Sequence, residues 1–393
     1  MAVAKKIAES IERSSWIRKM FEEGARLKAI HGEENVYDFT LGNPDVDPPA
    51  EFFRQLKQLS SSASKGVHGY MSNAGYPETR TSIAQKVSRE QGIQVPMEGV
   101  IMTCGAAGAL NMVLKTILDP GDQVIVPRPY FVEYGFYIQN HGGEMVLAET
   151  NEDFSLNVGN IESAITDKTR AILINSPHNP TGTVYSEKNI QELSDCINRL
   201  SAKGSTIYLI SDEPYRDIVY DNVSVAGIFK HCAQAIIVTS YSKSLSIPGE
   251  RIGYCAVNPG CRDFDRLMAG LILSNRILGY VNAPAMMQRI VASLNDIVVD
   301  IEPYKRRRDL FVKGLKDAGF TFTEPSGAFY IFCKAPGGDD VAFIRHLQQY
   351  NILAVPGVGF GGPGYFRIAY CVSEESIKKA LPVFKRAFAE FKA

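Results

Sequence analysis

The chain has 393 residues, of which 45% are hydrophobic and 22% are charged, the composition of an ordinary globular protein. With 42 basic and 43 acidic residues its formal net charge is −1, which excludes a global field that would draw it to nucleic acid or to an anionic membrane. No apolar run approaches the ~18 residues that a membrane helix needs. The length suits two domains, or one large domain with a smaller partner.

The first residues, MAVAKKIAESIERSSWIRKMFEEG, lack the apolar run of a secretory signal and have the pattern of an amphipathic helix. Seven cysteines are scattered along the chain, an odd number without any C-x-x-C pair. This usage is typical of reduced cysteines that pack in a core. We therefore expect a cytoplasmic protein, and we predict no metal site.

Between residues 100 and 256, short apolar runs alternate with helical patterns such as GAAGALNMVLKTIL. This alternation predicts βαβ units, and hence an α/β fold whose mainly parallel sheet is flanked by helices on both faces. The strand candidates are the segments 100–104, 123–129, 144–149, 171–177, 207–214, 235–242 and 252–257.

After Pro284 the pattern changes to a long helical stretch over 286–319, followed by strand-like segments with another helical stretch between them. Because strands and helices are here less regularly alternated, we predict a smaller α+β domain. We assign residues 48–284 to the large domain. Residues 1–47 and 285–393, which include the N-terminal helix, form the predicted small domain.

Lys243 lies in TSYSKSLSIPGERIGY, just past the buried strand candidate AIIVTS. In open α/β sheets, ligands bind at the carboxyl ends of the strands. A lysine near cationic or apolar neighbours loses its proton more easily and then attacks carbonyl groups. Ser240, Ser242 and Arg251 surround it in sequence, and hydroxyls with a guanidinium suit a phosphate. The stretch therefore predicts a site for a phosphate-bearing aldehyde.

Three further segments place polar or small residues after strand candidates. NSPHNPTG contains Asn179, which can bind a ligand oxygen, although Asn-Pro and Gly are also typical of a plain turn. ISDEPY contains Asp212 and Tyr215; this aspartate fits either a helix N-cap or a carboxylate aimed at a cation in the cleft. TCGAAG opens an apolar helix, which favours either close packing or a phosphate at the helix N-terminus.

Pyridoxal phosphate (PLP) needs all of these groups at once, because it carries an aldehyde, a phosphate, a ring N–H and a phenolic oxygen. The motifs N-P-T-G, D-E-P-Y, S-x-S-K and G-x-R-x-G also follow one another in this order. The chain thereby resembles the class I/II aminotransferases of PLP fold type I over nearly its whole length. This family belongs to the aspartate aminotransferase superfamily.

The resemblance implies an enzyme that moves an amino group between an L-amino acid and a 2-oxo acid. Lys243 would form the PLP imine and carry the proton, and Asp212 would keep the ring nitrogen protonated. Tyr215 and Asn179 would hydrogen-bond the phenolic oxygen, with Asn179 also near the substrate. The residues implied at the phosphate are Gly105, Ala106, Ala107, Ser240, Ser242 and Arg251.

The resemblance also implies contacts from distant parts of the chain. Gly42 in FTLGNPD and Arg367 in GYFRIAY would hold the substrate carboxylate, although a lone arginine there is equally typical of a surface strand. Tyr70 would reach the phosphate of a neighbouring subunit, which implies a homodimer with shared sites. Phe131, with Tyr130 second, would stack on the cofactor ring.

The substrate stays open among aspartate, alanine and aromatic amino acids. Aspartate-specific relatives of one subgroup carry a second arginine from the partner subunit, but Arg276 does not align cleanly with it when Pro284 is the reference. A Cα–S lyase or a decarboxylase of the same fold is the alternative function. The segment GVGFGG (357–362) fits G-x-G-x-x-G, but Pro363 and a strand follow where a dinucleotide site needs a helix. A non-enzymatic protein of this fold is disfavoured by the intact lysine, aspartate and arginine set.

Overall fold

The computed structural model describes residues 2–13, 15–61 and 66–391, with the side chains of residues 12–21 left aside. Its main feature is a seven-stranded sheet in the order β2-β8-β7-β6-β5-β3-β4. The strand β8 runs antiparallel to both of its neighbours, and the remaining pairs are parallel. The strands are β2 (Val100–Thr103), β3 (Gln123–Arg128), β4 (Glu144–Glu149), β5 (Thr169–Asn175), β6 (Tyr208–Asp212), β7 (Ala235–Ser240) and β8 (Gly253–Val257).

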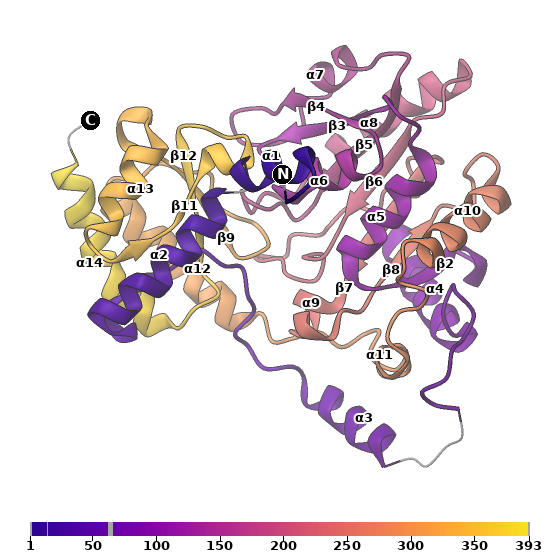
Figure 1. Ribbon diagram of the computed structural model, residues 1–393, viewed down its shortest axis with the longest axis horizontal. Helices are drawn as coiled ribbons and strands as arrows, with labels where there is room; N and C mark the ends of the chain where they lie inside the picture. Colours follow the sequence, from indigo (N-terminus) through magenta and orange to yellow (C-terminus); the bar gives the residue numbers. More distant parts are fainter. Residues whose placement is uncertain (1, 14, 62–65, 392–393) are drawn as a thin grey trace.

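Helices cover both faces of this sheet (Figure 1). Strand residues on one face share an apolar cluster with α5 (Gly105–Ile117), α6 (Glu133–Asn140) and α10 (Phe264–Ile277). The opposite face shares a second cluster with helices on the other side. The inner strands are buried on both faces, which is why they read as continuous apolar runs. The helices of the second face are α4 (Pro77–Gln91), α7 (Val158–Ser163) and α8 (Glu187–Ala202). The predicted α/β fold class is confirmed.

A second lobe lies at the left of Figure 1 and contains a three-stranded antiparallel sheet in the order β11-β12-β9. A short parallel pair joins β1 (Tyr37–Asp38) to β10 (Ile352–Leu353), so the N-terminal segment belongs to this lobe. The other elements here are α2 (Ser15–His31), α12 (Glu302–Asp317), β9 (Tyr330–Lys334), α13 (Asp340–Gln348), β11 (Val355–Pro356), β12 (Tyr365–Ala369) and α14 (Glu374–Glu390).

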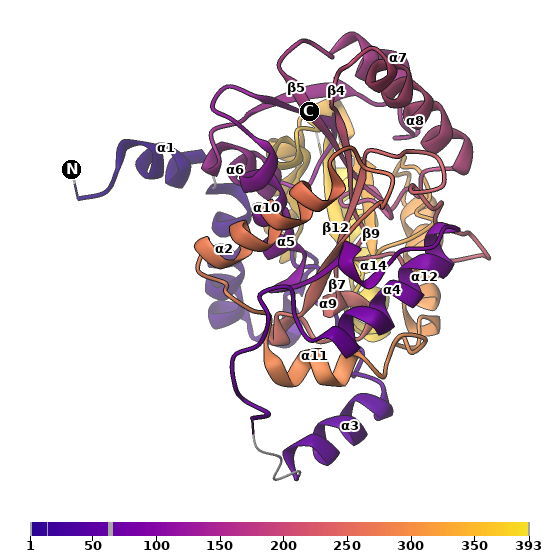
Figure 2. The same ribbon diagram turned by 90° about the vertical axis from the view of Figure 1, so that its right-hand side faces the viewer.

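The remaining helices are short or lie at the margins of the two lobes. Helix α3 protrudes at the bottom of both ribbon views but packs through Phe52 on the apolar cluster of the large lobe, and α1 projects from the molecule in Figure 2. These helices are α1 (Lys5–Arg13), α3 (Ala50–Ser60), α9 (Tyr241–Ser244) and α11 (Ala285–Val291), and the 3₁₀ turns are Glu33–Asn35, Met97–Gly99, Pro248–Glu250, Pro336–Gly338 and Gly357–Phe360. Of the helices in the described ranges, none is both long and apolar enough to cross a membrane.

The predicted domain boundary at Pro284 stays a prediction, and α11 is the element that bears on it. This helix follows the boundary, yet Met287, Ile290 and Val291 belong to the apolar cluster of the large sheet. The apolar cluster of the small lobe takes up the C-terminal part of the chain from Val299 onward. Residues 1, 14, 62–65 and 392–393 of the predicted domains lie outside the described part.

Candidate active site

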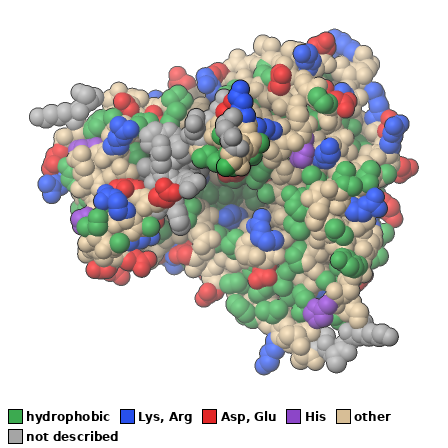
Figure 3. Space-filling view, viewed as in Figure 1, with side chains coloured by type: hydrophobic (Ala, Val, Ile, Leu, Met, Phe, Trp, Pro, Cys, Tyr) green, Lys and Arg blue, Asp and Glu red, His purple; other side chains and the backbone are tan. Residues whose placement is uncertain are grey.

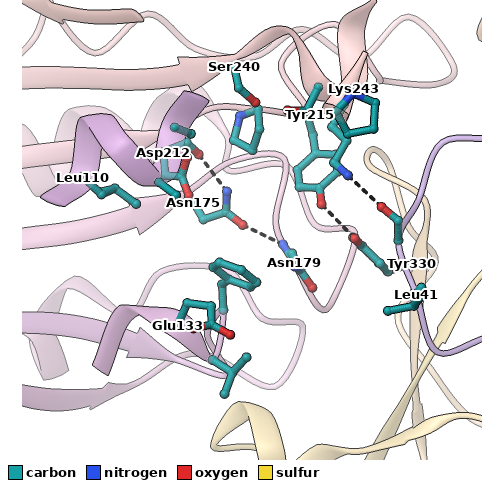
Figure 4. A pocket seen from close by; sticks show the side chains of 18 of the residues that line it. Leu41, Leu110, Glu133, Asn175, Asn179, Asp212, Tyr215, Ser240, Lys243 and Tyr330 are labelled. Carbon is teal, nitrogen blue, oxygen red and sulfur yellow. Dashed lines mark hydrogen bonds between the residues drawn. The ribbon is translucent and has the colours of Figure 1, made fainter. Parts of the chain in front are cut away.

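A cavity of about 360 Å³ opens at the carboxyl edge of the large sheet, where the small lobe meets it. Figure 3 shows a hollow between the two lobes, and Figure 4 shows the pocket from close by. Most of the residues that the sequence singled out line this one cavity. They are Gly42, Ala106, Ala107, Phe131, Asn179, Asp212, Tyr215, Ser240, Ser242, Lys243, Arg251 and Arg367.

Lys243 lies on α9, the single helical turn that follows β7. Its Nζ donates a hydrogen bond of 2.7 Å to the carbonyl oxygen of Gly42 and lies 5.5 Å from the ring centroid of Phe329. Burial lowers the pKa of Lys243 to about 8, and the nearby charges of Arg367 and Arg251 act in the same direction. At pH 7 this lysine is still mostly protonated, but roughly one side chain in ten is an uncharged, nucleophilic amine, far more than for an ordinary lysine.

Asp212 is the last residue of β6 and is 5% exposed. Its Oδ2 accepts a hydrogen bond of 2.6 Å from the hydroxyl of Tyr134, whereas Oδ1 has no partner among the described residues. Burial raises the pKa of Asp212 to about 7; the Tyr134 hydrogen bond opposes this shift and the charge of Glu213 adds to it. A buried carboxylate with one free oxygen is a partner for a cationic N–H.

A chain of side-chain hydrogen bonds runs from β6 to the small lobe. Asn175, paired in register with Asp212, donates to the Asp212 carbonyl at 2.7 Å and accepts from the backbone N–H of Asn179 at 2.7 Å (Figure 4). The Oδ1 of Asn179 in turn accepts from Arg367 Nη1 at 3.0 Å. Asn179 is therefore more than a turn residue, because its amide connects the two lobes.

Arg367 comes from β12 and is 5% exposed, which excludes the surface-strand interpretation. Its guanidinium carbon lies 4.6 Å from the ring centroid of Tyr330 and 4.6 Å from that of Phe360. Nη2 donates to the carbonyl of Thr40 at 2.5 Å, while Nε has no partner among the described residues. A guanidinium fixed between two rings can present its remaining donors to a carboxylate.

Tyr215 and Tyr330 join the two lobes through their hydroxyl oxygens, which are 2.8 Å apart. Gly42 lies against the same Tyr330 ring, since a Cβ added at Gly42 would be 1.8 Å from the Tyr330 oxygen. A side chain at residue 42 would therefore displace Tyr330 from its contact with Tyr215. The close approach explains why glycine stands at this position.

The candidate phosphate-binding residues meet where α5 begins. Gly105 has a positive φ of 73°, and a Cβ at this residue would be 3.2 Å from Nη2 of Arg251. Ala106 and Ala107 in the first turn of α5, together with the side chains of Ser240 and Ser242, line the same cavity. Backbone N–H groups at a helix N-terminus beside hydroxyls and a guanidinium form a suitable cradle for a phosphate.

The two aromatic candidates after β3, Phe131 and Tyr130, lie in different surroundings in the structure. Phe131 lines the cavity, whereas Tyr130 packs against Gly361, where a Cβ would be 2.6 Å from the Tyr130 ring. The backbone N–H of Tyr130 donates to the carbonyl of Phe360 at 2.9 Å. Of these two candidates, Phe131 is therefore the one that can contact a ligand in the cavity.

Tyr70 and Arg276 lie outside this cavity. Tyr70 is 95% exposed and lines a separate depression with His68, Met71 and Tyr280. Arg276 is exposed in the last turn of α10. The segment 357–362 forms a 3₁₀ turn that leads to β12, so no helix follows it to bind a dinucleotide. Of the described residues, no three His, Cys, Asp or Glu side chains gather in a metal-binding group.

Four residues at the site were missed by sequence reasoning: Tyr134, Asn175, Tyr330 and Glu133. Tyr134 follows Phe131 by three residues, and the centroids of their rings lie 5.5 Å apart where the chain enters α6, so this short spacing provided a usable signal. Asn175 ends its strand in register with Asp212. No sequence pattern pointed to Tyr330, since only the pairing of β9 with β12 brings this residue near Arg367.

These residues fit PLP. The unpartnered Oδ1 of Asp212 can accept a hydrogen bond from a ring N–H. The start of α5 and Arg251 form a cradle that suits a phosphate. The amine of Lys243 can react with an aldehyde. A parallel sheet with these groups at its carboxyl edge defines an enzyme that uses a phosphate-bearing aldehyde cofactor.

Comparisons with known proteins agree. The family model described as "Aminotransferase class I and II" matches residues 34–384, so the chain belongs to this PLP-dependent family of transaminases with fold type I. A crystal structure of an aminotransferase from Eubacterium rectale is 38% identical and covers 100% of both chains with a TM-score of 0.96.

The names of two further relatives specify a substrate. A probable aspartate aminotransferase from Methanocaldococcus jannaschii is 32% identical over 364 residues, covering 88% of this chain and 92% of the relative. The aspartate/prephenate aminotransferase of Thermus thermophilus is 33% identical over 357 residues, covering 88% of this chain and 89% of the relative. The predicted family, enzyme class and cofactor are confirmed.

Proposed function

We propose that Lys243, Asp212 and Arg367 carry the transamination of α-amino acids in the pocket between the two lobes. The observation that carries this assignment is the convergence of a partly deprotonated lysine, a buried carboxylate with a free oxygen and a buried arginine on one cavity. When bound, PLP supplies an electron sink that stabilises negative charge at the substrate Cα.

In this proposal each side chain has one task. Arg367 holds the substrate α-carboxylate as a fork-shaped donor, with Asn179 fixing the guanidinium from the large lobe. Asp212 holds a proton on the cofactor ring nitrogen through its free Oδ1. Lys243 moves a proton at the substrate Cα, for which an amine with a pKa of about 8 is suited. Tyr215 orients the cofactor and is itself oriented by Tyr330.

A single-turnover experiment tests this function. The purified, PLP-loaded protein is mixed with alanine, phenylalanine or aspartate, and the formation of the corresponding 2-oxo acid is measured without an acceptor. Stoichiometric 2-oxo acid, followed by recovery of the starting absorbance on adding 2-oxoglutarate, is the expected result. Release of carbon dioxide as the main reaction, or of hydrogen sulfide in a parallel reaction with cysteine, would instead indicate the decarboxylase or the lyase.

Replacing Arg367 with lysine should raise KM for all amino donors and lower kcat/KM by about 30- to several-thousand-fold. Truncating one member of a closed, hydrogen-bonded charge pair costs roughly 2–5 kcal/mol, and lysine cannot reproduce the bidentate contact. Steady-state kinetics with alanine, phenylalanine and aspartate should show similar losses, and PLP affinity should barely change. A loss confined to aspartate would show that Arg367 binds the side-chain carboxylate instead.

We also propose that the enzyme is a cytoplasmic homodimer in which Tyr70 completes the neighbouring site. The 95% exposed Tyr70 ring, in a depression with Met71 and Tyr280, supports an interface at this surface, because tyrosine is enriched at protein interfaces. All seven cysteines are unpaired and six are buried, which supports a reducing location.

Tyr70→Phe should weaken PLP binding by about 10- to 100-fold, the loss typical of one hydrogen bond to a charged group. The measurement is PLP titration of the apoenzyme, with sedimentation over a dilution series to test whether activity follows the dimer. Tyr350→Phe, which removes a hydroxyl bonded to Glu390 at the surface of the small lobe, is the matched control. A fully active monomer would contradict the shared site.

A further inference from the structure

Glu133 is an acidic side chain in the pocket that the proposed chemistry does not use. It is the first residue of α6 and lines the cavity together with Phe131 and Val132. In Figure 4 it projects from the α6 wall, across the pocket from Lys243 and Tyr215. No hydrogen bond or ion pair joins its carboxylate to the rest of the described chain. Burial raises the pKa of Glu133, as expected for a carboxylate that is desolvated without compensation.

Each cation that this chain contributes to the pocket already has another task in the proposed function. Arg367 donates to Asn179 and Thr40, and Arg251 donates to the Pro248 carbonyl beside the cradle at Gly105. The third cation, Lys243, is the amine that must be free for chemistry. Within the described part of the chain, no other lysine, arginine or histidine lines this cavity. A second carboxylate on a substrate would therefore lie near the Glu133 carboxylate, and none of the cations that the described part of this chain contributes to the cavity would be left to bind it.

The rest of the outer wall is apolar. Leu41, which is 45% exposed, lines the pocket with Leu110, Val132 and Pro248. Such a surface receives an aliphatic or aromatic side chain, and a carboxylate at its edge accepts a hydrogen bond from a hydroxyl, amide or ammonium group.

We propose that Glu133 is a specificity-determining residue that selects against amino acids with a side-chain carboxylate and favours those with neutral or hydrogen-bond-donating side chains. This inference rests on the proposed function, because it takes the α-carboxylate to be bound by Arg367. It predicts a substrate range other than the aspartate that the names of two relatives specify. The physical cause is like-charge repulsion in a partly desolvated site, which suppresses wrong partners.

The kinetic test compares kcat/KM for aspartate with kcat/KM for alanine in the wild type and in Glu133→Gln. We expect alanine and phenylalanine to be better donors than aspartate in the wild type. The aspartate-to-alanine ratio should rise at least about tenfold in Glu133→Gln, because the isosteric amide removes the repulsion. Glu144→Gln removes the same charge from an exposed position on β4 and should leave the ratio unchanged. Glu133→Ala should move the ratio in the same direction.

A binding test separates this inference from the proposed function. Isothermal titration of the PLP-loaded protein with butyrate and with succinate compares one carboxylate with two, and requires no turnover. The succinate-to-butyrate affinity ratio should be low in the wild type and rise at least about tenfold in Glu133→Gln.

Two results would overturn the proposal. The first is a wild type that prefers aspartate to alanine and loses this preference in Arg276→Ala, because a partner subunit would then supply the missing cation. The second is that neither the aspartate-to-alanine kcat/KM ratio nor the succinate-to-butyrate affinity ratio changes between the wild type and Glu133→Gln. If no amino acid reacts but the succinate-to-butyrate affinity ratio still rises in Glu133→Gln, the proposed transamination is wrong. The selection by Glu133 against a second carboxylate then still holds.

Discussion

Replacing Lys243 with alanine is expected to reduce turnover by at least about 1,000-fold while PLP still binds without a covalent bond. General acid–base groups contribute about 10²- to 10⁴-fold, and this amine is the basic group placed beside Gly42 at the centre of the pocket. The phosphate cradle, Asp212 and Tyr215 remain in the variant, so the cofactor should keep most of its noncovalent contacts.

The measurement has three parts. Borohydride treatment and peptide mapping of the wild type should place the pyridoxyl label on Lys243. Activity of Lys243→Ala should be partly restored by a small primary amine, which fits the space that the side chain leaves. Lys188→Ala, at an exposed position on α8, is the control and should keep full activity. A label on another lysine would end the assignment.

Exchange of Asp212 for asparagine is expected to lower kcat by at least about 100-fold without unfolding the protein, comparable to removing other key electrostatic groups. The neutral amide keeps the shape of the side chain and can still accept from Tyr134, but it cannot stabilise a positive charge at the unpartnered Oδ1 position. Since the carboxylate is buried with a raised pKa, its removal should not lower the free energy of unfolding.

Two companion variants make this result specific. Tyr134→Phe removes only the hydrogen bond that Tyr134 donates to Oδ2 of Asp212 and should cost less activity than Asp212→Asn. Asp195→Asn, on the exposed side of α8, should leave kcat unchanged. Thermal unfolding measured alongside separates a catalytic loss from a folding defect. Near wild-type turnover of Asp212→Asn would reduce this aspartate to a structural role.

The large sheet could be predicted because its inner strands are buried on both faces, so each of them forms a continuous apolar run, and helical segments separate these runs. For the same reason the residues directly after β5, β6 and β7 could be identified, and Asn179, Asp212 and Lys243 do lie in one cavity. Neighbouring parallel strands place their carboxyl ends together whatever the details of the side chains.

Contacts between the lobes could not be predicted, because they depend on pairings that leave no periodic signal. Tyr330 has an unremarkable place in an apolar strand, and its contact with Arg367 follows from the register of β9 and β12. The segment 357–362 suggested a nucleotide loop by its glycines, whereas its Phe360 covers one face of the Arg367 guanidinium. The packing of α11 on the large sheet likewise depends on tertiary contacts that an apolar helical pattern does not specify.

The position of β2 at the edge of the large sheet has a consequence for the order in which a nascent chain acquires function. This strand, which leads into the phosphate cradle at Gly105, pairs only with β8, and Val100 is matched with Ala256. The parallel ladder from β3 to β7 can therefore form during synthesis while β2 still lacks its neighbour. The cradle closes only after residue 257 has left the ribosome, and Arg367 emerges later still. A ribosome-bound fragment that ends before β8 should thus hold a folded sheet segment that cannot retain the cofactor.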